Sequence, residues 1–270
     1  MNNEYCTPIT PSADAQRPLS FRVIALDLDG TLTNRDKEVT PRTRQALADA
    51  QRRGATIILA SGRPTYGIMP VAQCLDLEHT GGYILAYNGG KIVDCRTQEV
   101  LYERHLPNEV IPLIYQYAVR TGHALLGYVG NEIITEKPHD EYVGEESRIN
   151  KMAIRKVDNL LEHLEPHPTK LLMTGHPADM DVYRSAPFFI ELVPKGIDKA
   201  QSLRRLLGHI NLTPADMIAF GDGYNDLSML HLAGMGVAMA NAAPEVRADA
   251  DAVTLSNDAD GVAVALKKYL

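Results

Sequence analysis

The chain has 270 residues and a formal net charge of −7, and 45% of its residues are hydrophobic and 23% charged. This length allows one large domain or two ordinary ones, and the composition is that of a soluble globular protein. The acidic balance argues against general nucleic-acid binding, because that requires a basic surface. The three cysteines are widely spaced, which excludes a disulfide framework and a CxxC metal site.

Residues 1–19 are polar and carry three prolines, so they are predicted to form a flexible N-terminal extension. They lack the basic region and the apolar run of a signal peptide. No later stretch of the sequence is apolar for long enough to span a membrane. We therefore expect a cytoplasmic protein.

The run from Phe21 to Leu28 is rich in Val, Ile and Leu, which predicts a strand buried on both faces. Asp27 and Asp29 stand two residues apart at its end, so their side chains point to the same side of an extended chain. Two like charges there are costly unless a cation lies between them, and Mg²⁺ prefers carboxylate oxygens. The turn at Gly30-Thr31 offers backbone N–H groups that can hold an anion.

The next segments of the sequence predict a strand–helix–strand (βαβ) unit. Thr40-Pro41 places a capping hydroxyl before a proline, which predicts a helix that continues to Gly54. Residues 55–60 form a second apolar run, which ends in Ser61-Gly62-Arg63. Because the connections are short, we expect a parallel sheet with a right-handed crossover.

From residue 83 the pattern changes. A strand-like run at 83–87 ends in the turn signal Asn88-Gly89-Gly90. Beyond it, short strands are expected at 91–93, 100–102, 124–129 and 170–174, and helices at 109–120 and 157–164. Residues 88–187 are therefore predicted to form a separate α+β module that is inserted into the first domain.

The first pattern then returns. Strands are expected at 188–193, 217–220 and 236–239, and helices at 199–207, from Thr213-Pro214, and at 226–233. Residues 20–87 and 188–270 are thus predicted to form one α/β domain with a Rossmann-like, doubly wound parallel sheet. Four of the expected strands end in polar residues, namely Asp27, Ser61, Asp222 and Asn241. Ligands bind at the carboxyl ends of the strands in such sheets, so these residues indicate one active site.

Four motifs occur in an order that resembles a known superfamily. They are DLDGTL at 27–32, SGR at 61–63, GIDK at 196–199 and GDGYND at 221–226. This arrangement is similar to the haloacid dehalogenase (HAD) superfamily and, within it, to the Cof-type (YidA-like) sugar-phosphate phosphatases. The resemblance runs from about residue 20 to the end of the chain. It implies that residues 88–187 are a C2-type cap that sets substrate specificity.

The resemblance also implies catalytic roles. Asp27 would be the nucleophile that forms an aspartyl-phosphate, and Asp29 the general acid and then the general base. Ser61 would donate its hydroxyl to a phosphate oxygen, and Lys199 would neutralise the developing charge. Lys195 is the alternative lysine, although the run that precedes Lys199 fits the motif better.

The implied cofactor is Mg²⁺. Its ligands would be the carboxylates of Asp27 and Asp222 and, by resemblance, the backbone carbonyl of Asp29. Asp226 would bind the metal directly or through water, or it would simply be an acidic residue favoured at a helix N-terminus.

Other residues of the motifs are expected to contact the substrate. Arg63 and Asn88-Gly89 lie near the predicted mouth of the site, although a turn role also explains Asn88-Gly89. Asn225 is expected to orient neighbouring groups. The candidate substrate-binding residues are Gly30, Thr31, Gly62, Arg63, Asn88, Gly89 and Asn225.

The implied function is Mg²⁺-dependent hydrolysis of small phosphorylated metabolites, such as sugar phosphates, flavin mononucleotide or pyridoxal phosphate. A monomer or small homo-oligomer is expected, with neither nucleic acid nor membrane as partner. A phosphoglucomutase-like phosphotransferase would use the same aspartates, and a non-catalytic phosphometabolite-binding protein is a further alternative. A receiver-type signalling module does not explain the chain length. A dinucleotide fingerprint fails because Asp226 stands where glycine or alanine is needed, and no P-loop motif is present.

Overall fold

The structure, a computed structural model, describes residues 19–174, 184–186 and 189–270. Nearly all of the predicted N-terminal extension therefore lies outside the described residues. Two β-sheets organise the described chain, one of eight strands and one of six. The predicted α/β fold, with a large and mainly parallel sheet, is confirmed.

The larger sheet has the strand order β14-β13-β12-β1-β2-β3-β4-β5. Its strands are β1 (Val23–Leu26), β2 (Thr56–Ala60), β3 (Tyr83–Ala86), β4 (Lys91–Asp94), β5 (Val100–Glu103), β12 (Met217–Gly221), β13 (Met235–Ala238) and β14 (Ala252–Val253). All neighbours from β14 to β3 pair in parallel, and β4 and β5 form an antiparallel edge. The central strand β1 is fully buried, as its unbroken apolar run predicts.

Helices cover both faces of the larger sheet. They are α1 (Pro41–Arg52), α2 (Thr65–Cys74), α3 (Leu77–Thr80), α7 (Lys199–His209), α8 (Leu227–Leu232), α9 (Pro244–Asp249) and α10 (Gly261–Tyr269). Ile24 of β1 belongs to the core beneath α1, α2 and α10, whereas Ala25 belongs to the core beneath α7, α8 and α9. Neighbouring residues of the strand thus face opposite layers, as the pleat requires. This sheet and its helices form the larger unit.

The smaller sheet has the strand order β10-β11-β9-β6-β7-β8. Its strands are β6 (Leu125–Val129), β7 (Glu132–Thr135), β8 (Ala153–Lys156), β9 (Leu171–Thr174), β10 (Arg184–Ala186) and β11 (Phe189–Leu192). The helices that pack on this sheet are α4 (Ile111–Thr121), α5 (Glu141–Asn150) and α6 (Leu160–His163). α4 and α6 pack on one face, and α5 packs on the other. This sheet and its helices form the smaller unit.

Several elements differ from those expected from the sequence. The sequence predicts that residues 88–187 form the inserted module, but β4 and β5 extend the larger sheet because β4 pairs with β3. The strand expected at 188–193 is predicted to belong to the α/β domain, but β11 pairs with β9 in the smaller sheet. The helix expected from Thr213-Pro214 is one 3-10 turn, because β12 begins at Met217.

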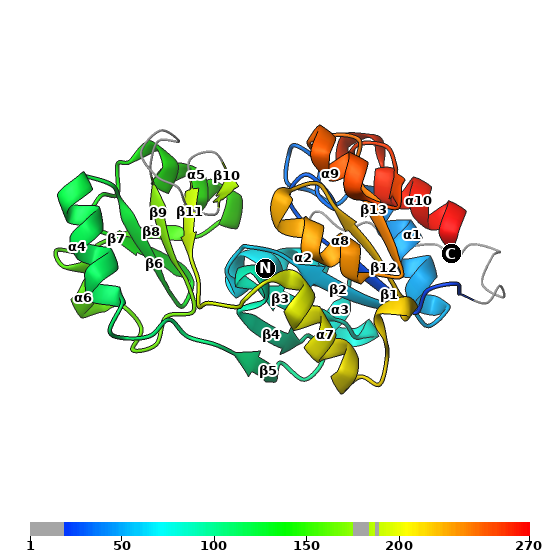
Figure 1. The fold of residues 1–270 in the computed structure, drawn as a ribbon, viewed down its shortest axis with the longest axis horizontal. Coiled ribbons are helices and arrows are strands. Elements are labelled where there is room, and N and C mark those ends of the chain that lie inside the picture. Colours follow the sequence, from blue (N-terminus) through cyan, green and yellow to red (C-terminus); the bar gives the residue numbers. More distant parts are fainter. Residues whose placement is uncertain (1–18, 175–183, 187–188) are drawn as a thin grey trace.

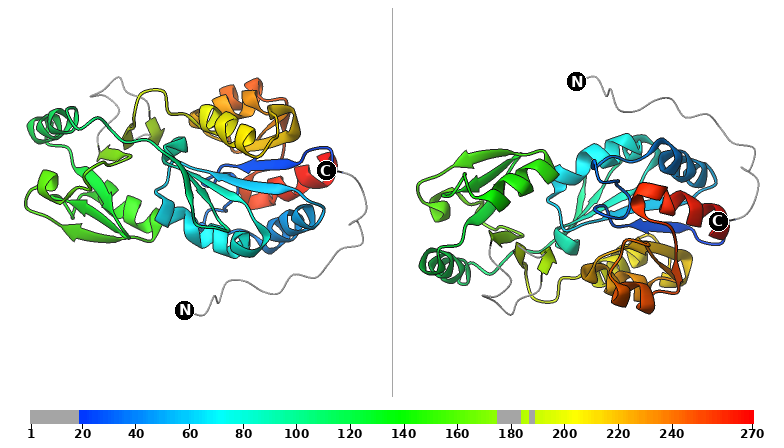
Figure 2. Two further views of the ribbon diagram at one scale, coloured as in Figure 1. Left: turned by 90° about the horizontal axis from the view of Figure 1, so that it is seen from below. Right: turned by 90° about the horizontal axis from the view of Figure 1, so that it is seen from above.

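The two units lie side by side, and the chain crosses between them after β5 and again after β11 (Figure 1). Figure 2 shows the same separation from two further directions. Among the described residues, no helix has the length and apolar character needed to cross a membrane. The carboxyl ends of the parallel strands β1, β2 and β12 lie on the side of the larger unit that faces the smaller unit.

Candidate active site

Three neighbouring strands of the larger sheet bring the predicted site residues together. Asp27 follows β1, and its backbone N–H donates to the carbonyl of Phe220 in β12 at 3.0 Å. Ser61 follows β2, and Asp222 follows β12. All three residues line one cavity of about 330 Å³. Three of the four strand ends expected to converge therefore do so, whereas Asn241, at the fourth, donates to the carbonyl of Gly30 at 2.8 Å and is not among the residues that line the cavity.

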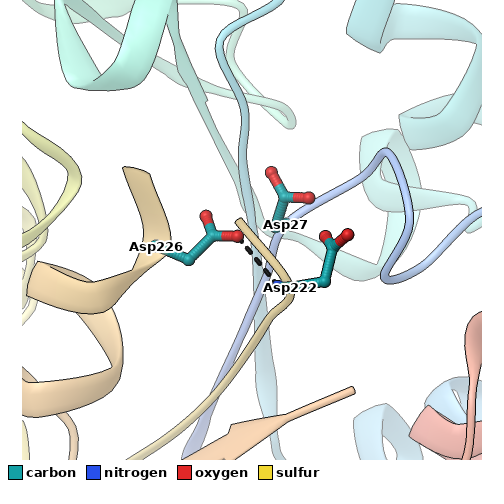
Figure 3. A group of neighbouring side chains, drawn as sticks. All are labelled: Asp27, Asp222 and Asp226. Carbon is teal, nitrogen blue, oxygen red and sulfur yellow. Dashed lines mark hydrogen bonds between the residues drawn. The ribbon is translucent and has the colours of Figure 1, made fainter. Parts of the chain in front are cut away.

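Three carboxylates meet at these strand ends. One oxygen from each of Asp27, Asp222 and Asp226 lies within 4.8 Å of the others. Figure 3 shows the three side chains directed toward one shared space. Asp226 also accepts hydrogen bonds through Oδ2 from the backbone N–H groups of Asp222, at 3.0 Å, and Gly223, at 2.9 Å. Asp226 therefore both fixes the GDGYND loop and contributes to the cluster.

Lys199 neutralises part of this negative charge. Its side chain is 0% exposed, and Nζ donates to Asp27 Oδ1 at 2.6 Å and to Asp226 Oδ1 at 2.5 Å. Burial by itself lowers the pKa of the ammonium, but the charges of Asp226 and Asp27 outweigh this effect and raise the pKa above its ordinary value. The alternative lysine, Lys195, is exposed.

One ammonium does not balance three carboxylates. Burial, followed by the charge of Asp226, raises the pKa of Asp27 well above its ordinary value despite the opposing charge of Lys199. Burial and the charge of Asp226 likewise raise the pKa of Asp222 to about 6, although the Thr31 hydroxyl donates to Asp222 Oδ1 at 2.9 Å. A site in which carboxylates remain short of positive charge is suited to a hard divalent cation.

Asp29 lies apart from this cluster. The Arg63 guanidinium binds both of its carboxylate oxygens, at 2.6 and 2.7 Å, and Lys37 Nζ donates to one of them at 2.6 Å. Burial alone would raise the pKa of Asp29, but the hydrogen bonds and charges of Arg63 and Lys37 lower it to about 2. In this arrangement Asp29 is therefore ionised.

The remaining predicted residues support the site in different ways. Gly30 has φ +82°, and a Cβ there would collide with the Asp222 carboxylate, so glycine permits this close approach. Gly62 and Asn225 line the cavity. Asn88 is buried, and its side chain lies between the side chains of Asn225 and Glu191. Gly89 packs against Ser202, which donates to its carbonyl at 2.7 Å. Neither Asn88 nor Gly89 is among the residues that line the cavity.

Reasoning from the sequence missed several residues that line the cavity. One of these, Lys37, lies in the larger unit, and the others come from the smaller unit. Those from the smaller unit are Glu145, Glu146, Ile149, Lys170, Leu172 and Glu191. No motif marks these positions, and the six residues of the smaller unit reach the site only through the packing of one unit against the other.

The chain is similar to a family model and to several solved structures. A family model described as haloacid dehalogenase-like hydrolase matches residues 24–266. The crystal structure of a haloacid dehalogenase-like hydrolase from Bacteroides thetaiotaomicron is 46% identical, with a TM-score of 0.87, over 93% of this chain and 100% of that chain. The structure of TM0651 from Thermotoga maritima is 30% identical, with a TM-score of 0.78, over 92% of this chain and 97% of that chain.

A named relative agrees with these matches. Phosphatase YwpJ of Bacillus subtilis (strain 168) is 28% identical over 288 residues, a similarity that covers 93% of this chain and 100% of the relative. The family match spans both units and all four motifs on which the resemblance was based. The predicted resemblance is thereby confirmed, and the chain belongs to the haloacid dehalogenase-like hydrolases.

Proposed function

We propose that the chain is a Mg²⁺-dependent phosphatase that hydrolyses small phosphomonoesters through an aspartyl-phosphate on Asp27. The observation that carries this proposal is the position of Asp27, which lies in a buried cluster with Asp222, Asp226 and Lys199 and lines a cavity between the two units. Membership of the family and similarity to Phosphatase YwpJ support phosphate-ester hydrolysis.

The carboxylates of this structure fit a magnesium ion. Asp27, Asp222 and Asp226 would hold it, because their oxygens converge and their buried charges raise the pKa values of Asp27 and Asp222. When bound, Mg²⁺ supplies positive charge that offsets the repulsion between a carboxylate and a phosphate dianion. Asp226 would bind the ion directly or through water.

The residues around the cluster have separate tasks. A carboxylate oxygen of Asp27 attacks phosphorus while the bond from phosphorus to the leaving oxygen breaks, and water then cleaves the new bond to Asp27. Lys199 holds Asp27 in place and favours its ionised form through its charge. Ser61, which lines the cavity, would donate its hydroxyl to a phosphate oxygen.

The general-acid role of Asp29 requires a rearrangement. A carboxyl group with a pKa of about 2 is not protonated at neutral pH, so Asp29 must first exchange its contacts with Arg63 and Lys37 for contact with the leaving oxygen. Phosphate bound beside Ser61 would compete for Arg63, which lines the same cavity. Substrate binding thereby provides a route to the protonated form of Asp29.

We further infer that the smaller unit acts as the cap and that the leaving alcohol is small. A cavity of about 330 Å³ is small for a ligand site. Among the described residues, the smaller unit contributes the carboxylates of Glu145 and Glu146 to its wall, and carboxylates accept hydrogen bonds from hydroxyl groups. Both observations favour sugar phosphates over flavin mononucleotide.

The test is phosphate release from a panel of sugar phosphates, flavin mononucleotide, pyridoxal phosphate and an aryl phosphate, with Mg²⁺ and then with chelator. Asp27→Asn should abolish Mg²⁺-dependent release, because an amide is not a competent nucleophile. Asp36→Asn makes the same change at an exposed residue and should leave the rate unchanged. Release that persists in Asp27→Asn would remove Asp27 from the mechanism. Transfer of phosphate to a second sugar instead of water would identify a phosphotransferase.

A further inference from the structure

A buried ion pair of the smaller unit lies against the loops of the active site. Lys170 immediately precedes β9, and Glu191 belongs to the neighbouring strand β11. Lys170 Nζ donates to Glu191 Oε1 at 2.7 Å, and the two side chains are 3% and 4% exposed. Neither residue belongs to the four motifs.

The other hydrogen bonds of this pair reach across to the larger unit. Lys170 Nζ also donates to the carbonyl of Gly62 at 3.0 Å, and the Asn88 amide donates to Glu191 Oε2. Burying two charges is costly unless further hydrogen bonds satisfy them, and an apolar pair of the same size is often at least as stable. General stability therefore does not explain a charged pair at this position, and its remaining hydrogen bonds join the two units.

The groups that the pair contacts belong to the phosphate side of the site. Gly62 stands between Ser61, whose hydroxyl accepts from the backbone N–H of Arg63 at 3.2 Å, and Arg63, which holds Asp29. The backbone N–H of Asn88 donates to the carbonyl of Ser61 at 2.9 Å. A Cβ at Gly62 would lie 3.0 Å from Glu191 Oε1, so a side chain there would crowd the carboxylate.

We propose that Lys170 and Glu191 are positioning residues: their ion pair transmits the position of the smaller unit to the Ser61-Gly62-Arg63 loop and to Asn88. The loop then holds Ser61 ready for phosphate only while the two units are closed on each other. This role in catalysis rests on the proposed phosphatase function, whereas the effect on the loop does not.

The decisive variant is Lys170→Met with Glu191→Met, since an apolar pair should preserve folding. Amide hydrogen exchange in residues 61–63 and 87–90 should become about tenfold faster or more, because the loop loses its contacts with the smaller unit. In the same variant the KM for an aryl phosphate and the inhibition constant for inorganic phosphate should rise together, by about tenfold or more.

A matched control is Glu132→Met with Arg155→Met, which removes an ion pair of 2.8 Å between β7 and β8 of the same sheet. These changes should leave both exchange and kinetics as in the wild type. Unchanged exchange in the Lys170/Glu191 variant would overturn the proposal, as would faster exchange with unchanged KM in an active enzyme. If the wild type releases no phosphate, the proposed function fails, and the exchange rates still decide whether the pair holds the loop.

A second variant covers the case in which the double variant does not fold. Glu191→Gln has the same shape, so the fold should persist, but the amide presents a donor where the Asn88 amide also donates. Amide exchange and KM should change in the same directions as in the double variant, but by smaller factors. A folded Glu191→Gln protein with wild-type exchange and KM would overturn the proposal.

Discussion

Replacing Lys199 by methionine should destabilise the metal-free protein strongly and make its stability depend on Mg²⁺. In the wild type the ammonium lies between Asp27 and Asp226 and is fully buried. Methionine has a similar length but no charge, so the substitution leaves carboxylates buried without a partner. Protonation of these carboxylates relieves part of the cost, and the defect should therefore shrink at low pH.

The expected size follows from the burial of the group. Removing one member of a buried ion pair costs about 3–5 kcal/mol. In a chain of this size about 1 kcal/mol changes the unfolding midpoint by about 2–4 °C, so the midpoint in chelator should fall by about 6–20 °C. Thermal unfolding followed by circular dichroism measures this change. Lys195→Met, at an exposed position near the same helix, should change stability by no more than about 0.5 kcal/mol.

Mg²⁺ provides the second arm of the experiment. A ligand at 100 times its dissociation constant stabilises the folded state by about 2.7 kcal/mol, and the variant has no ammonium to compete with the ion. Mg²⁺ should therefore raise the midpoint of Lys199→Met more than that of the wild type. A variant that unfolds in chelator at the wild-type temperature would show that Lys199 does not balance the charge of this cluster.

Two further predictions concern the same site and its closure. Burial and the charge of Asp226 raise the pKa of Asp222 to about 6, above its value in the unfolded chain, so the folded state binds the extra proton. In chelator, the unfolding midpoint should fall as pH rises from 5 to 7, and saturating Mg²⁺ should remove this slope. Gly67→Ala in α2 should favour the helix by about 0.5–1 kcal/mol, but its Cβ would collide with Asn150 Oδ1 of the smaller unit. The kcat/KM of Gly67→Ala should fall without loss of stability, because the added Cβ keeps the two units from packing together. Adding Asn150→Ala to the same chain should restore kcat/KM. Full activity of Gly67→Ala alone would show that this contact between the units is not needed for catalysis.

Local sequence signals were sufficient for the larger unit because each of them has a local physical cause. Thr40 caps α1 through its side chain, and Pro41 begins the helix, as the pair predicts. The apolar strands β1, β2 and β12 end where polar residues begin, and parallel pairing then places Asp27, Ser61 and Asp222 at one edge. The strand pattern is thus enough to locate the cluster before any distance is known.

The signals failed at the boundaries between the two units, where a short strand can join either sheet. A short strand such as β4 carries no information about which sheet it joins, and its antiparallel pairing with β3 follows from the tight turn between them. The helix α5, which brings Glu145 and Glu146 to the cavity, was not predicted, since its polar sequence has only a weak apolar stripe. The part of the cavity wall that α5 forms could therefore not be predicted from the sequence.

The two buried lysines, Lys199 and Lys170, have different contacts at the site. Lys199 binds Asp27 and Asp226, which both belong to the larger unit, so the balance of charge at the cluster does not require the smaller unit. Lys170 belongs to the smaller unit and contacts Gly62 of the larger one, so its contacts exist only when the units are closed. The three carboxylates proposed to hold Mg²⁺ all belong to the larger unit, so the proposed metal site does not need the smaller unit, whereas the proposed positioning of the Ser61 loop does. Loss of the Lys170 and Glu191 pair should then weaken phosphate binding and leave the affinity for Mg²⁺ unchanged.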